Sequence, residues 1–300
     1  MNTLRAEWTK LRTLPGTGWL LLGAVVATVI VSATVSASLS CTSTAACHPD
    51  ITKLSLTGTY LGQAIVAIVA VLAVSSEYGT GMIRTTLAAM PRRTTMLAAK
   101  AAVVTAATLA AGAAAVLGEY GTGMIRTTLA AMPRRTTVLA AKAAVVSAVT
   151  LAAGAAAVLG SLLAGRLILP GHGYTPAAGY PALSLANGTV LRAAAGTVLY
   201  LALIALLSLG VATAIRDSAV AIGAVLGLLY LFPILAQVAG NPGVARQLQQ
   251  IGPMTAGLQI QASTGLRSLP IGPWAGLGVA AAWAAAALAA GALALCRRDA

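Results

Sequence analysis

Charged residues are scarce in this 300-residue chain, at 8% of the sequence. Soluble globular domains carry roughly 25%, so this value, with a mean hydropathy of +0.88, excludes an ordinary soluble domain. Acidic residues are the scarcest, six against nineteen Lys and Arg, which gives a net charge of +13. The basic residues lie in short segments between apolar runs, a pattern typical of cytoplasmic loops rather than of a nucleic-acid-binding surface. The composition therefore predicts an integral membrane protein.

Cysteine and histidine are also rare, with three and two copies. Cys41 and Cys47 flank a short polar loop and could form a disulfide if that loop faces an oxidising compartment. Cys47 and His48 with Asp50 match no standard spacing of metal ligands. The sequence has no H-E-x-x-H or Walker A motif, and no acidic residue falls within an apolar run. We therefore expect no catalytic residue, metal site or cofactor in this chain, and no enzyme activity of its own.

Apolar runs of 21 to 24 residues dominate the sequence, and each is long enough to cross the roughly 30 Å hydrocarbon core of a bilayer as a helix. They are Gly18–Leu39, Leu56–Ser76, Ala143–Gly165, Ala193–Ile215, Ala219–Gly240 and Pro273–Cys296. The expected fold is all-α, a polytopic transmembrane helical bundle with six core spans, forming one domain over residues 1–300. Residues 1–15 favour an amphipathic helix in the cytoplasmic interface, although a plain basic flank would orient the first span equally well.

A tandem duplication interrupts this pattern. Residues 77–118 and 119–160 align without gaps and differ at only three of 42 positions, Met96/Val138, Thr105/Ser147 and Ala107/Val149. Stacked repeat proteins usually need three or more units, so two near-identical copies indicate a recent duplication and not a solenoid.

The first copy adds an extra Ala-rich segment, Ala101–Gly118, which ends abruptly at Glu119. Few of its residues drive membrane insertion, because alanine lies near zero on insertion scales. If it does not cross, fourteen of the nineteen Lys and Arg fall on the cytoplasmic side; if it crosses, only eleven do. The positive-inside rule therefore predicts a helical segment that stays in or near the cytoplasmic interface.

The duplicated stretch also carries a resemblance. SSEYGTGMIRTTLAAMPRRTTMLAAK at 75–100 resembles the cytoplasmic segment between the second and third spans of type-2 ATP-binding-cassette permeases from actinobacteria. The similarity continues in AEWTKLRT at 6–13, in SLGVATAIRDSAVAIGAVLGLL at 208–229, and in PWAGLGVAAAWAAAALAAGALALCRRDA at 273–300. It covers nearly the whole chain except the 42 extra residues, and it says nothing about the substrate.

The resemblance implies the permease subunit of an ATP-driven transporter, with export as the expected direction. It also implies that two such subunits pair in the plasma membrane, with both termini cytoplasmic. A separate ATPase subunit, which holds ATP and Mg, docks on a coupling helix. Carried over by position, the docking residues are Glu77, Tyr78, Gly81, Ile83, Arg84 and Leu87 in the first copy, and Glu119, Tyr120, Gly123, Ile125, Arg126 and Leu129 in the second.

Other interpretations stay open at this point. Either copy could dock the ATPase, and the basic loop could serve only to orient the spans. A membrane scaffold or regulatory protein without transport activity is the alternative function.

Two smaller expectations concern the C-terminal third. Gly276, Ala280 and Ala284 recur every four residues and could form the face on which two copies pair, or they could simply belong to an Ala-rich span. The segment 241–272, with Gly and Pro between short apolar pieces, could form short re-entrant helices.

Overall fold

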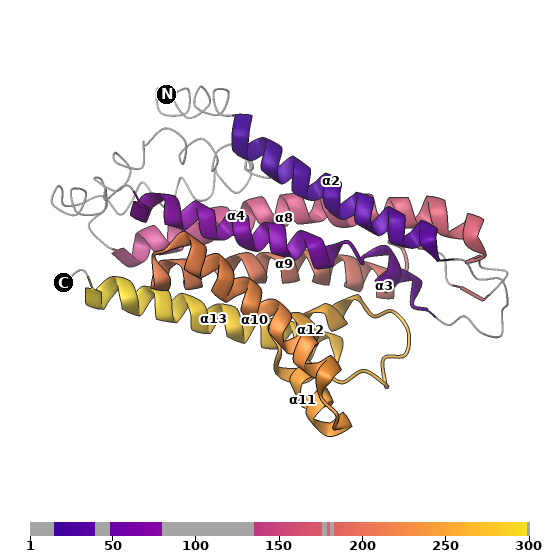
Figure 1. The fold of residues 1–300 in the computed structure, drawn as a ribbon. Helices are drawn as coiled ribbons and strands as arrows, with labels where there is room; N and C mark the ends of the chain where they lie inside the picture. Colours follow the sequence, from indigo (N-terminus) through magenta and orange to yellow (C-terminus); the bar gives the residue numbers. More distant parts are fainter. Residues whose placement is uncertain (1–14, 40–48, 80–134, 176–178, 181–182, 299–300) are drawn as a thin grey trace.

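The computed structural model describes residues 15–39, 49–79, 135–175, 179–180 and 183–298, and the structural statements below concern those residues. They form an all-helical bundle in which no strand occurs, as the sequence predicts (Figure 1). The long helices are α2 (Pro15–Ser38), α4 (Thr59–Gly79), α8 (Arg135–Ile168), α9 (Gly188–Ile215), α10 (Ser218–Val238) and α13 (Pro273–Arg298). Shorter elements are α3 (Ile51–Ser55), η1 (Leu169–His172), α11 (Pro242–Ile251), α12 (Pro253–Gly257) and η3 (Leu258–Gln261).

Each predicted apolar run lies largely within one long helix, but several helix ends differ from the predicted ends. α9 begins five residues before its apolar run because the Asn187 side chain caps it, accepting a hydrogen bond from the Thr189 amide at 3.2 Å. Asp217 caps α10 in the same way through the amide of Val220, at 2.8 Å. Hydropathy marks the apolar part of a helix, whereas capping residues set where the helix starts.

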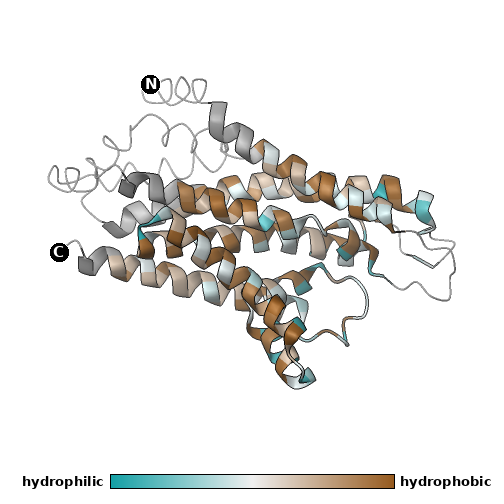
Figure 2. Ribbon diagram, viewed as in Figure 1, coloured by the Kyte–Doolittle hydropathy of each residue, from teal (hydrophilic) through white to brown (hydrophobic). Residues whose placement is uncertain are grey.

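Length and hydropathy separate the long helices into two groups. Four apolar stretches of the described chain are long enough to cross a membrane: Val146–His172, Gly188–Ile215, Ser218–Val238 and Pro273–Ala294. α2 and α4 contribute the shorter apolar stretches Leu22–Ser38 and Thr59–Leu72. Hydrophobic residues line the described lengths of these helices (Figure 2). The structure thus fits a helical membrane bundle in which four described helices are long and apolar enough to cross, and six spans stay a prediction.

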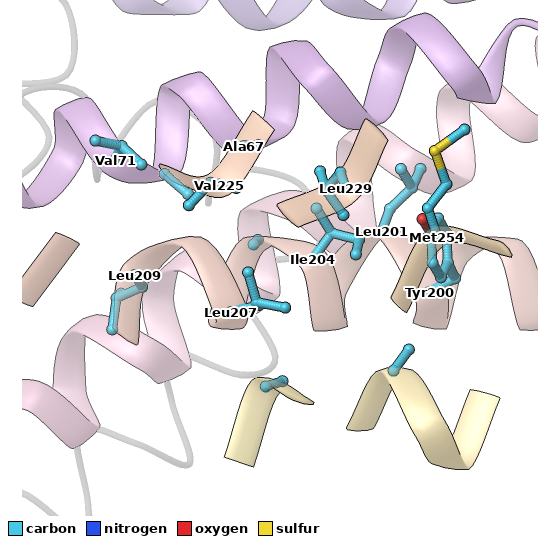
Figure 3. Packing of buried hydrophobic residues seen from close by; sticks show 14 of the residues in the cluster. Ala67, Val71, Tyr200, Leu201, Ile204, Leu207, Leu209, Val225, Leu229 and Met254 are labelled. Atoms are coloured by element: carbon cyan, nitrogen blue, oxygen red, sulfur yellow. The ribbon is translucent and has the colours of Figure 1, made fainter. Parts of the chain in front are cut away.

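The helix α9 forms the centre of the bundle and contacts α4, α8, α10 and α13. Its side chains Tyr200, Ile204 and Leu207 are fully buried in the main core cluster. Figure 3 shows side chains of α4 and α10, among them Val71 and Leu229, in the same cluster. A helix covered on so many sides must be apolar around its circumference, which is why α9 has little amphipathic character.

The small-residue face of α13 is buried within the chain, so its predicted role in pairing two copies is wrong. Ala280 and Ala284 are only 1% and 2% exposed. A methyl group added at Gly276 would lie 2.9 Å from the carbonyl carbon of Ala256 in α12. Small residues at four-residue spacing predict a close helix contact, but they do not reveal whether the partner helix belongs to the same chain.

The segment 241–272 forms short helices, as expected. Asn241 caps α11, and Pro242 occupies its first turn. The following α12 and η3 are largely buried, with Met254, Ala256 and Ile260 at most 3% exposed. They contact α9 and α13, so this part of the connection turns back into the bundle.

Candidate functional site

The predicted docking residues lie almost entirely outside the described part of the chain. Glu77 and Tyr78 belong to the last turn of α4. The others fall within 80–134, outside the described residues: Gly81, Ile83, Arg84, Leu87, Glu119, Tyr120, Gly123, Ile125, Arg126 and Leu129. Cys41 and Cys47, and the segments 1–14 and Ala101–Gly118, also lie outside the description.

The helices that flank the duplication nevertheless constrain it. α4 ends at Gly79, inside the first copy, and α8 begins at Arg135, inside the second. Figure 1 places the end of α4 and the beginning of α8 at the same end of the bundle as the C-terminal end of α13. The chain therefore leaves α4 and enters α8 on one side, which is also the side of the basic C-terminus.

A hydrogen-bonded polar network joins α4, α9 and α10, and it runs from the buried Tyr200 and Gln63 to an exposed bond between Tyr230 and Tyr60. The Tyr200 hydroxyl donates to the side-chain carbonyl of Gln63. The Gln63 amide donates to the Tyr230 hydroxyl at 3.4 Å, and that hydroxyl donates to the backbone carbonyl of Tyr60. Gln63 and Tyr200 are fully buried.

This network stabilises the helix arrangement. Hydrogen bonds between helices in a membrane contribute about 0.6 kcal/mol each on average, and an unpaired amide in an apolar interior is costly. Gln63 would therefore be unfavourable without Tyr200 and Tyr230, and with them it fixes the rotation of α4 relative to its two neighbours.

The short helix α12 packs directly on this network. A methyl group added at Gly257 would lie against the ring of Tyr200, 2.6 Å from Cδ2. Met254 and Leu258 belong to the same core cluster as Tyr200. The position of α12 and the position of the Tyr200 side chain therefore depend on each other.

Sequence reasoning missed this site. The sequence offers two weak signals for it. Gln63 is an amide within a largely apolar run, and Tyr200 is the sole aromatic residue of its run. Neither feature reveals its partner, because Gln63 and Tyr200 are 137 positions apart in the sequence.

No group of three or more His, Cys, Asp or Glu that could hold a metal ion occurs among the described residues. Comparisons with protein-family models, with curated proteins and with solved structures give no match for this chain.

Proposed function

We propose that this chain is the permease subunit of an ATP-driven transporter of the type-2 ATP-binding-cassette kind, with six spans, working as an exporter. In this proposal a separate ATPase docks on the cytoplasmic segment that contains the duplication, and a second permease subunit completes the pathway. The sequence resemblance supports the family, and the all-helical bundle with long apolar helices agrees with it.

One observation carries the docking part of the proposal. α4 ends, and α8 begins, at the end of the bundle where α13 also ends (Figure 1). In the sequence, residues 80–134 lie between these two helices. A segment that docks a soluble subunit must begin and end on that subunit's side of the membrane. The placement of these helix ends supports such a segment.

Reconstitution tests the function. The chain is purified with a candidate ABC-type ATPase, inserted into liposomes, and assayed for ATP hydrolysis while candidate substrates are added. We expect hydrolysis that rises with a transported substrate and needs both subunits. Hydrolysis that is unchanged when this chain is left out would favour the alternative of a scaffold or regulatory protein.

A prediction about topology follows from the shared end. A reporter fused after Ala300 and a single cysteine at Thr136 should report the same side, because α8 begins and α13 ends at one end of the bundle. The positive-inside rule predicts that this side is the cytoplasm. The cysteine is tested with an impermeant thiol reagent on intact and permeabilised cells, after the native cysteines are replaced by serine. Labelling of the Thr136 site in intact cells, with a cytoplasmic reporter signal, would contradict the arrangement of α8.

A further inference from the structure

Asp50, at the end of the bundle opposite the C-terminus, connects two distant parts of the chain. Its Oδ2 accepts hydrogen bonds from the backbone amides of Ser263 and Thr264, the latter at 2.9 Å. Its Oδ1 accepts from the Ser263 hydroxyl at 2.6 Å. Oδ1 also caps α3 through the amides of Thr52 and Lys53, at 3.1 and 3.2 Å. One carboxylate thus ties α3 to the chain that follows η3.

A second contact strengthens the same junction. Arg192 near the beginning of α9 donates from Nη2 to the carbonyl of Ala262 at 2.6 Å. The two contacts hold consecutive residues, Ala262 to Thr264, against α3 and α9. This junction lies at the end of the bundle opposite the C-terminus (Figure 1).

The segment held by these contacts, residues 262–264, directly follows α12 and η3. Ile260 packs on α9, where a methyl group added at Gly196 would lie 3.0 Å from its Cδ1. Gln261 is fully buried, and among the described residues neither polar atom of its side chain has a hydrogen-bond partner. A buried amide without partners disfavours the inserted position of this segment, so other contacts must hold it there.

The exposed side of the junction allows it to open. Thr264, Gly265 and Leu266 are exposed, and Gly265 has a φ of 61° in the left-handed region that suits a turn. Water can replace the amide donors of Ser263 and Thr264 on Asp50.

The Asp50 carboxylate stays charged over the neutral range. Burial raises its pKa, but the hydrogen bonds from Ser263, Thr264 and Lys53 outweigh burial and lower the pKa below the ordinary 3.8. The stability that these bonds contribute is present above that ordinary value and is lost only as the pH falls through the lower folded value. The junction therefore does not respond to pH between about 5 and 7.

We propose that Asp50 is a latch: its bonds to Ser263 and Thr264 hold α12 and η3 inserted, and their release opens this end of the bundle toward Tyr200. The latch is a property of the chain alone. Only its use in transport, as an outer gate, rests on the proposed function.

Hydrogen exchange of the purified chain in detergent tests the latch without any ATPase. Asn at position 50 still caps α3 well, but it turns one oxygen into an NH₂ group that faces two amide donors. In Asp50→Asn we expect the backbone amides of residues 254–262 to exchange about tenfold faster or more, a factor equal to about 1.4 kcal/mol. Asp217→Asn is the matched control, because Asp217 also caps a helix, α10, through a backbone amide. It should leave this exchange unchanged.

A crosslink keeps the test decisive if Asp50→Asn fails to fold. In the double variant Asp50→Cys and Ser263→Cys, with the native cysteines changed to serine, the oxidised protein should protect residues 254–262 and the reduced protein should not. Either of two results would overturn the latch. In the first, a folded Asp50→Asn variant exchanges at the same rate as the parent. In the second, the crosslink variant exchanges at the same rate whether it is oxidised or reduced. If hydrogen exchange supports the latch but the reconstituted chain shows no transport, the result counts against the proposed function and not against the latch.

Discussion

Replacing Gly210 with leucine is expected to prevent the bundle from folding. Gly210 of α9 faces the backbone of α13, where an added methyl group would touch Ala287 and lie 2.5 Å from the amide nitrogen of Leu288. Backbone atoms cannot rotate away as a side chain can, so α9 and α13 would have to separate. We expect a loss of stability beyond the ~3 kcal/mol of ordinary overpacking, seen as loss of the monodisperse peak in size-exclusion chromatography.

The matched control is Gly223→Leu in α10. A methyl group added at Gly223 meets no atom within 4 Å, so the same change should leave folding intact. Alanine variants refine the comparison, because alanine favours a helix over glycine by about 1 kcal/mol. Gly210→Ala should lower the unfolding temperature although its helix propensity rises. Equal unfolding temperatures for the two alanine variants would contradict the close contact between α9 and α13.

The described fold was largely predictable from apolar runs. Hydrophobic stretches longer than 20 residues leave few structures besides a helix, since every backbone polar group must be satisfied within the segment. The six long helices accordingly lie where six runs occur. Their ends were less predictable, because Asn187 and Asp217 extend or start helices through side-chain caps that hydropathy does not register.

Contacts between distant segments could not be predicted. The bond between Asp50 and Ser263 joins residues 213 positions apart, and nothing local in either segment indicates the other. The face of Gly276, Ala280 and Ala284 is a second example. Its spacing correctly predicted a close helix contact, but it did not reveal that the contacting partner lies in the same chain. Periodicity defines a face, whereas its partner depends on the whole arrangement of helices.

Charge reversal at both copies of the proposed docking motif is expected to release the proposed ATPase partner. Arg84 and Arg126 occupy equivalent positions, so Arg84→Glu with Arg126→Glu removes the positive charge from both copies. We expect the amount of ATPase that co-purifies to fall at least tenfold, about 1.4 kcal/mol or more of binding free energy. The single variants identify the copy that docks, since only the copy in use should lose binding.

The control for this experiment is Arg267→Glu. Arg267 is an exposed residue of the connection between η3 and α13. Its reversal changes the net charge without touching the duplication, so co-purification should persist. Undiminished ATPase on the double variant, with normal insertion into the membrane, would remove the docking role of both copies.

The most direct test of the whole account is co-purification of the unaltered chain with a candidate ABC-type ATPase. Both are expressed together, only this chain carries an affinity tag, and the eluted complex is quantified by size-exclusion chromatography with light scattering. The account predicts equal numbers of the two subunits and ATP hydrolysis by the eluted complex. A folded, membrane-inserted chain that elutes alone, while the ATPase remains soluble and active in the same cells, would contradict it.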